Sequence, residues 1–277
     1  MSRAVKVLSI ALPLALFSAD AFAWGLETHL FFAQWLLAAM PFADRELRAA
    51  AARFPRLVLA GACLPDLALA GKVLGTPAFR RAHSWATLRR IAAAPADDAA
   101  RALGIGYASH LLADIVAHNA FVPEHERRIA RVPHVTHAIA EFAMDHHVRG
   151  ELAISPSVAL SADRPALVAF ATRVFPCDAA LAGRALGLLA HADGALRSST
   201  LPRLCRRILD AYYRNPAYRF ERYVKVVKAR LQQLEAALAG EFSDWVSLDP
   251  EGRARDAGAD RRARQHIARV MQAQHDA

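Results

Sequence analysis

Alanine is abundant in this chain and restricts the folds open to it. Of 277 residues, 62 are alanine; 55% of the chain is hydrophobic and only 8% is aromatic. Because alanine is the strongest helix former and a poor strand former, we predict a mostly helical protein. The composition excludes a disordered chain, a collagen-like repeat and a disulfide-dense small scaffold. The length suits one large domain or two small ones.

Apolar residues recur at helical spacing along most of the chain. Asp44 is expected to cap the second helix, and Asp97 and Asp98 to open a long one. Prolines and glycines predict a loop over residues 62–82. With no alternating strand of useful length and no internal repeat, we predict one all-α domain of eight to ten helices. The predicted helices lie at residues 29–39, 44–61, 97–119, 133–150, 163–174, 178–196, 200–213, 217–241 and 258–273.

The first 23 residues have the pattern of a secretory signal peptide. Arg3 and Lys6 supply the positive charge, residues 7–17 form an apolar stretch, and residues 21–23 (AFA) offer a cleavage site. The apolar stretch is too short to cross a bilayer, which requires about 20 residues. We therefore expect a soluble protein, secreted or periplasmic, whose mature chain begins at Trp24.

The chain is basic, with a net charge of +9, 31 arginines and four lysines. This charge favours an anionic partner, such as nucleic acid or a phospholipid surface, although a solvated basic surface explains it equally well. The spacing of the three cysteines fits no thiolate zinc site. Cys177 and Cys205 end two adjacent predicted helices and are candidates for a disulfide, which would leave Cys63 as a free thiol.

Nine of the twelve histidines lie within residues 29–147, interleaved with acidic residues at helical spacing. They include two triplets of histidine and acidic residues spaced four apart. Because residues four apart stay on one face of a helix, the three side chains of each triplet would point to the same side of their helix. Imidazole and carboxylate are the ligands that zinc and similar divalent ions prefer. A single pair of this kind is more often an exposed ion pair, but two triplets in apolar surroundings favour a metal site in a helical core. The triplets are His110, Asp114, His118 and His137, Glu141, Asp145.

Together with Trp24, these residues resemble the zinc-dependent phospholipase C family, which shares its fold with zinc-dependent single-strand nucleases. Mature chains of that superfamily begin with a Trp whose free amino nitrogen and carbonyl oxygen bind zinc. Here His29 follows Trp24 in the segment WGLETH, and Asp66 in GACLPD and His83 in RRAHSW continue the family order. The resemblance covers about residues 24–150.

The resemblance implies an all-α domain of the phospholipase C and zinc nuclease type, with two or three zinc ions in its helical core. It implies hydrolysis of a phosphodiester, with Asp66 as zinc ligand, general base or both, and with Asp114 bridging two zinc ions. Export would precede activity, because only a free N-terminal Trp24 can chelate in this way. The implied zinc ligands are Trp24, His29, Asp66, His83, His110, Asp114, His118, His137 and Glu141.

The spacing departs from the family pattern at His118. Well-known members have five residues between the bridging Asp and the next His, whereas three separate Asp114 from His118. Other residues are therefore alternatives by position. They are His125 for His118, His134 for His137, and Asp145 beside or in place of Glu141.

Three functions are consistent with the sequence, and we expect the first. A phospholipase C would act at a phospholipid or membrane surface and release diacylglycerol and a phosphorylated alcohol. A nuclease on the same scaffold needs exposed aromatic side chains that stack on bases, for which Tyr107, Tyr212 and Tyr213 are candidates. A non-catalytic envelope protein would keep zinc for folding.

Beyond residue 150 the sequence shares only helicity with the family. We divide the chain into a signal peptide (1–23), a metal-binding helical core (24–150) and a helical C-terminal half (151–277) packed on the same domain. Within that half, residues 219–230 interleave cations with apolar side chains. This pattern predicts an interfacial helix or, more commonly, a helix whose apolar face packs on the core.

Overall fold

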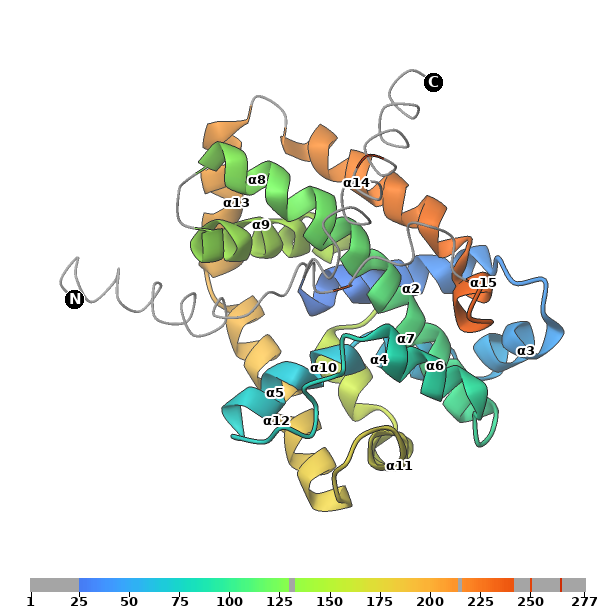
Figure 1. Cartoon of the computed structure of the whole chain (residues 1–277). Helices are drawn as coiled ribbons and strands as arrows, with labels where there is room; N and C mark the ends of the chain where they lie inside the picture. Colours follow the sequence, from blue (N-terminus) through green and yellow to red (C-terminus); the bar gives the residue numbers. More distant parts are fainter. Residues whose placement is uncertain (1–24, 130–132, 214–215, 242–249, 251–264, 266–277) are drawn as a thin grey trace.

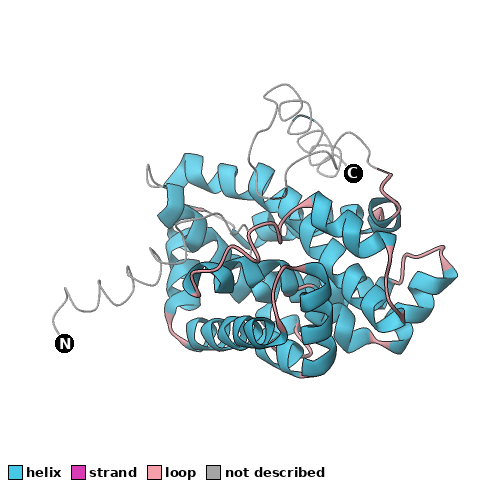
Figure 2. Ribbon diagram, turned by 60° about the horizontal axis from the view of Figure 1, so that its bottom comes forward, coloured by secondary structure: helices cyan, strands magenta, loops and turns pink. Residues whose placement is uncertain are grey.

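The computed structural model describes residues 25–129, 133–213, 216–241, 250 and 265. Within this part of the chain the regular structure is entirely helical, and Figure 2 shows helices joined by loops. The predicted all-α class is confirmed. The described residues form fourteen α-helices, so the expected number of eight to ten is too low.

The helices pack around α7, which lies near the middle of the molecule (Figure 1). Three short turns, η1 (Leu64–Asp66), η2 (Ala117–Phe121, π-helical) and η3 (Arg149–Glu151), connect some of them. The α-helices are α2 (Leu26–Ala39), α3 (Arg45–Arg53), α4 (Pro55–Gly61), α5 (Leu67–Val73), α6 (Trp85–Ala93), α7 (Asp98–Val116), α8 (Val122–Ile129), α9 (Pro133–Val148), α10 (Pro156–Ser161), α11 (Arg164–Val174), α12 (Ala179–Ser198), α13 (Leu201–Tyr212), α14 (Pro216–Leu231) and α15 (Leu234–Leu238).

Helix caps define several of these starts. The Asp44 carboxylate accepts hydrogen bonds from the Glu46 and Leu47 backbone N–H groups, at 2.7 and 3.0 Å. Asp97 accepts one from Ala100 N at 2.7 Å. Both predicted helix starts are confirmed, and in each case the side chain satisfies a backbone donor that the first turn leaves unpaired.

Two predictions about segment type are wrong. The helix expected over residues 44–61 breaks at Phe54, because Pro55 has no N–H to continue the first helix and instead opens α4. The loop expected over residues 62–82 contains η1 and α5, since Pro65 lies in a first turn, where its missing donor costs little. Helices α6, α8 and α10 also fall outside the predicted ranges, and the helix predicted at 217–241 is divided into α14 and α15. The helix predicted at 258–273 lies outside the described residues.

Helix α7 is the buried centre of the fold, with every side chain from Ala102 to Val116 buried. It crosses α4 at very short range, because a Cβ at Gly106 would lie only 2.0 Å from the Val58 carbonyl oxygen. A Cβ at Gly61 would lie 2.3 Å from the Leu103 carbonyl oxygen. Only glycine permits this approach, and it brings the end of α4 against the face of α7 that carries polar residues.

One hydrophobic core includes residues from both halves of the chain. In α14, Phe220, Tyr223 and Val226 are buried in this core. The pattern at residues 219–230 is thus that of a helix packing its apolar face inward. Helix α13 lies along α9, which ties the C-terminal half to the segment that carries the second histidine triplet.

None of the three cysteines forms a disulfide, so the disulfide suggested between Cys177 and Cys205 is not formed. Cys63 and Cys205 are fully buried, and burial raises the pKa of the Cys63 thiol well above its usual value. These cysteines therefore act as small apolar core residues.

No single helix in the described part of the chain has the length and apolar composition of a membrane span. Two sharply bent helix pairs satisfy that test only in combination, Arg45–Arg53 with Pro55–Val73 and Arg164–Val174 with Ala179–Leu196.

Candidate metal centre

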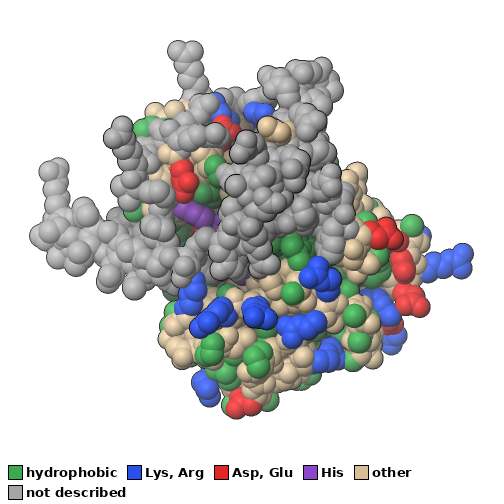
Figure 3. Space-filling view, in the orientation of Figure 1, with side chains coloured by type: hydrophobic (Ala, Val, Ile, Leu, Met, Phe, Trp, Pro, Cys, Tyr) green, Lys and Arg blue, Asp and Glu red, His purple; other side chains and the backbone are tan. Residues whose placement is uncertain are grey.

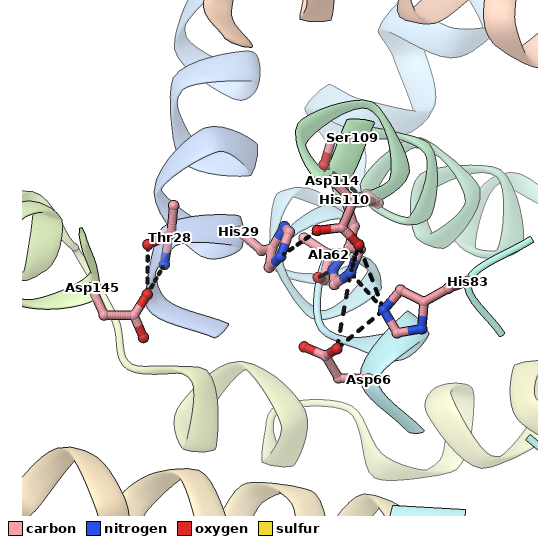
Figure 4. A network of polar contacts seen from close by, with 10 residues as sticks. Thr28, His29, Ala62, Asp66, His83, Ser109, His110, Asp114 and Asp145 are labelled. Atoms are coloured by element: carbon pink, nitrogen blue, oxygen red, sulfur yellow. Dashed lines mark hydrogen bonds and ion pairs between the residues drawn. The ribbon is translucent and has the colours of Figure 1, made fainter. Parts of the chain in front are cut away.

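Five histidine and aspartate side chains from four segments converge beside α7 (Figure 4). Helix α2 supplies one, η1 another, the segment before α6 a third, and α7 itself two. Each is at most 3% exposed, although these residue types usually remain in contact with water. They are His29, Asp66, His83, His110 and Asp114.

The first group joins α2 to α7. The Nε2 atom of His29 lies 3.3 Å from Asp114 Oδ1, and His110 Nε2 lies 3.0 Å from Asp114 Oδ2. The imidazole rings of His29 and His110 are stacked, with their centroids 3.5 Å apart. These three side chains could therefore hold one ion between them.

The second group lies on the other side of His110. The Nε2 atom of His83 is 3.2 Å from Asp66 Oδ1, 3.1 Å from His110 Nε2 and 3.6 Å from Asp114 Oδ2. The two oxygens of Asp114 thus face different partners, Oδ1 toward His29 and Oδ2 toward His83 and His110. A carboxylate in this orientation can bridge two metal ions.

The donor separations agree with zinc. Tetrahedral zinc with ligands at about 2.0–2.1 Å holds neighbouring donor atoms about 3.3–3.4 Å apart. The closest contacts between donors of the cluster run from 3.0 to 3.6 Å. An alternative network of hydrogen bonds is incomplete, because neither ring nitrogen of the buried His29 makes one and Asp114 Oδ1 accepts none. The residues therefore fit a zinc site better than a closed hydrogen-bond network.

One backbone carbonyl group orients His110, and another fixes the segment that carries His83. The Nδ1 atom of His110 lies 2.7 Å from the Ala62 carbonyl oxygen, so this nitrogen carries the hydrogen and Nε2 is left to bind a metal. The close crossing of α4 and α7 makes this bond possible. Near His83, the buried hydroxyl of Tyr107 donates to the Ala82 carbonyl oxygen and so ties the segment before α6 to α7.

Asp66 occupies the N-cap position of α5, where an aspartate commonly caps the helix. Its side chain makes no capping hydrogen bond. One carboxylate oxygen instead lies 3.2 Å from His83 Nε2 and 4.0 Å from His110 Nε2. The geometry of Asp66 is thus that of a residue directed at the cluster.

Burial and mutual charge shift the pKa values of the first group. Burial lowers the pKa of His29, and the neighbouring His110 lowers it further. Burial alone would lower the pKa of His110 as well, but Asp114 and Asp66 outweigh it and raise that pKa. For Asp114, burial is outweighed by His110 and His29, which hold its pKa well below the usual range. These shifts favour the ionised form of Asp114 and the neutral form of His29, which are the forms that bind a metal, whereas His110 holds a proton more tightly than an ordinary imidazole.

Three predicted ligands remain, and the first of them lies on the π-helical turn η2, which follows α7 directly. His118 lies on this turn, and its ring centroid is 5.5 Å from that of His137 on α9. Its Nε2 makes no hydrogen bond, and burial lowers its pKa to about 3 although Asp114 opposes the shift. Glu141 follows His137 by one turn of α9. These three side chains do not form a compact donor group among the described residues.

The positional alternatives lie elsewhere or remain undescribed. His125 is enclosed by aromatic rings, including Phe121 at 4.3 Å between centroids, and its Nδ1 faces the Phe121 carbonyl oxygen at 2.7 Å. Asp145 accepts hydrogen bonds from Thr28. The His134 side chain and all of Trp24 lie outside the described residues.

Sequence reasoning missed the residues that support the donors. Ala62 and Tyr107 act through a backbone carbonyl and a buried hydroxyl, and their residue types carry no signal for such a role. Asp145 belongs to the second triplet, but only the structure directs it toward α2. The one available signal was the pair of glycines, Gly61 and Gly106, each inside a helix where glycine is unfavourable without a packing reason.

Comparison with known proteins adds one relationship. A family model described as zinc dependent phospholipase C matches residues 28–172, just over half of the chain. Searches among curated proteins and among solved structures each returned no significant match. The matched span includes both donor groups and also His118, His137 and Glu141.

Proposed function

The chain belongs to the zinc-dependent phospholipase C family, and we propose that it is an exported zinc-dependent phosphodiesterase. Its proposed reaction is hydrolysis of a phospholipid to diacylglycerol and a phosphorylated alcohol. The observation that carries this proposal is the cluster of five buried donors, in which the two oxygens of Asp114 face two different groups of histidines. Without a cation this cluster leaves buried polar atoms unsatisfied, which costs free energy.

The proposed site residues would all hold zinc, and one of them, Asp66, would also move a proton. Bound zinc supplies Lewis acidity toward phosphoryl oxygens and lowers the pKa of coordinated water to about 7. Asp66 is the proposed general base, because one of its oxygens faces His83 and the other can accept a proton. The proposed ligands are Trp24, His29, Asp66, His83, His110, Asp114, His118, His137 and Glu141.

We propose that the five clustered donors would hold two zinc ions, with His110 binding only one of them through Nε2, and that His118, His137 and Glu141 would hold a third. The π-helical turn supports the third site, because it changes the direction of the side chain at residue 118 relative to a continuous α-helix. It would thereby compensate for the short spacing between Asp114 and His118. The neutral His118 ring, with its unbonded Nε2, is in the form that binds a metal.

Phospholipid is a better-supported substrate than nucleic acid. Of the three tyrosines considered for base stacking, Tyr107 and Tyr213 are buried, and only Tyr212 is exposed. A nuclease surface would need more exposed aromatic side chains. Among the described residues on the face seen in Figure 3, Lys and Arg side chains extend across the lower part of the molecule, which suits a broad anionic surface.

The test is hydrolysis of two substrates by purified protein reconstituted with zinc. We expect release of phosphocholine from phosphatidylcholine and no nucleotides from single-stranded DNA. Asp66→Asn should lower that activity by at least about 100-fold, since general base catalysis contributes about 10²–10⁴-fold. Asp163→Asn, which alters an exposed helix cap, is the matched control. Nucleotide release would indicate the nuclease, and no product from either substrate would favour a non-catalytic zinc protein.

A further inference from the structure

The first turn of α2 is attached to the end of α9 by two polar contacts. Asp145 Oδ1 accepts hydrogen bonds from the Thr28 hydroxyl at 2.5 Å and from Thr28 N at 3.1 Å. Four residues further on, Arg149 Nε contacts both carboxylate oxygens of Glu27, at 3.0 and 2.9 Å. Glu27 and Thr28, which are adjacent in the first turn of α2, are therefore held by two residues that lie four positions apart, Asp145 and Arg149.

Asp145 acts as a helix cap supplied from a distant part of the chain. The N-cap residue of α2 is Gly25, which has no side chain to accept a hydrogen bond from the first turn. The Thr28 N–H also approaches the Gly25 carbonyl oxygen at 3.1 Å, and Asp145 adds the side-chain acceptor that the N-cap residue lacks. A carboxylate is stabilised at this end of a helix by the helix dipole, and Asp145 is itself 0% exposed.

The neighbouring residue His29 has no comparable support on its own ring. Histidine ligands usually donate their second ring nitrogen to a carbonyl or carboxylate, as His110 does to Ala62. The His29 ring stacks on His110, and its Nε2 faces Asp114 Oδ1 at 3.3 Å, but among the described residues its Nδ1 has no hydrogen-bond partner. Its direction is therefore determined by the backbone of α2.

Successive helix residues point about 100° apart, so fixing Thr28 also fixes the direction of His29. Figure 4 shows this arrangement, with Thr28 turned toward Asp145 on α9 and His29 turned toward Asp114 on α7. We propose that Asp145 and Arg149 form a clamp, defined by their contacts with Thr28 and Glu27, that positions His29 for zinc. The clamp thus assigns Asp145 a positioning role instead of a place among the ligands.

This inference rests on the proposed function, and its test measures zinc binding rather than activity. The variants are Asp145→Ala, which removes the acceptor, and Thr28→Val, which removes only the hydroxyl. Asp163→Ala is the matched control, because Asp163 accepts from Ala166 N and caps α11. Each full chain is titrated with zinc against a competing chelator. The visible spectrum of the cobalt-substituted protein and the thermal unfolding of the metal-free protein are also recorded.

We expect Asp145→Ala to raise the dissociation constant of one zinc by about 10- to 100-fold and to change the cobalt spectrum. Thr28→Val should raise the same dissociation constant by a smaller factor. If Asp145→Ala does not fold, the result for Thr28→Val tests the clamp. Asp163→Ala should lower thermal stability without affecting zinc. Lower stability of Asp145→Ala or Thr28→Val with unchanged zinc affinity and cobalt spectrum would overturn the clamp alone. A wild-type protein that binds no zinc would overturn both proposals.

Discussion

At the scale of single residues, the buried donors differ in what holds them. His110 is oriented by a hydrogen bond to a carbonyl group, His83 lies in a segment tied down by Tyr107, and His29 depends on its helix. His118 has no hydrogen bond at Nε2 and is strongly desolvated. These differences lead to separate expectations for substitutions in the metal-free protein.

The first expectation concerns His118 and pH. Because its folded-state pKa is about 3, against an ordinary value of 6.5, the unfolded chain binds a proton that the folded chain does not. The metal-free protein should therefore lose stability as pH falls from about 6.5 toward 3. His118→Gln removes this contribution, so its free energy of unfolding should decline less over that range.

Urea denaturation of the metal-free proteins at pH 6.5 and 4.5 measures this difference. His191→Gln, at an exposed position, should behave like the wild type. An equally steep decline in His118→Gln would show that His118 is not a source of the acid sensitivity.

The second expectation concerns Tyr107, whose hydroxyl donates to the Ala82 carbonyl oxygen inside the core. Tyr107→Phe leaves that carbonyl without its partner and should lower the free energy of unfolding by about 1–3 kcal/mol. Tyr212→Phe, at a side chain 57% exposed, should change it by less than about 0.5 kcal/mol. Chemical denaturation measures both, and a similar effect of the two substitutions would refute the role of the Tyr107 hydroxyl.

At the scale of helices, the close crossing of α4 and α7 determines where the candidate metal centre lies. A Cβ atom added at Gly61 or Gly106 would overlap a carbonyl oxygen of the opposite helix. The same approach brings the Ala62 carbonyl to His110 and η1, with Asp66, to the cluster. A change in this crossing should therefore affect both stability and zinc binding.

Gly106→Ala tests this connection. Because its Cβ would lie 2.0 Å from the Val58 carbonyl oxygen, the helices must separate, at a cost of about 1–3 kcal/mol. Zinc affinity should fall as well. In Gly183→Ala no atom lies within 4 Å of the new Cβ, so that variant should gain about 0.5–1 kcal/mol. Denaturation and zinc titration measure the pair, and normal zinc binding by Gly106→Ala would contradict the positional argument.

The sequence predicted these helices where local signals agreed. Asp44 and Asp97 mark real caps, and the long apolar periods correspond to α7, α9, α11 and α12. It failed at residues 62–82, where proline and glycine suggested a loop although Pro65 begins a turn and Gly71 packs beside Phe79. Glycine and proline indicate a break only if no tertiary contact requires them, and a single sequence does not reveal such contacts.

At the scale of the whole molecule, segments distant in sequence build one centre inside one core. The residue types and their order could be predicted from the sequence because a metal site would constrain them chemically. The contacts that support the donors could not be predicted, because the Asp145–Thr28 contact spans 117 residues and depends on how α9 packs on α2. The part of the chain after residue 172 lies beyond the family match and contributes α13 and α14 to the packing around α9.

One prediction concerns the N-terminus that the proposed export would create. If Trp24 binds zinc through its free amine, one additional residue before it converts that amine to an amide. The extended protein should then contain about one zinc fewer per chain than protein beginning at Trp24. Metal analysis combined with N-terminal sequencing measures this, and identical zinc content in the two forms would exclude the proposed chelation.

The most direct test of the zinc centre is the metal content of three purified proteins. The wild type should contain two or three zinc ions per chain, and Asp114→Asn should lose at least one, because both oxygens of Asp114 face histidine donors. Asp97→Asn, which alters only the cap of α7, should retain the wild-type content. A wild-type protein without zinc, or equal zinc in Asp114→Asn and Asp97→Asn, would contradict the central claim.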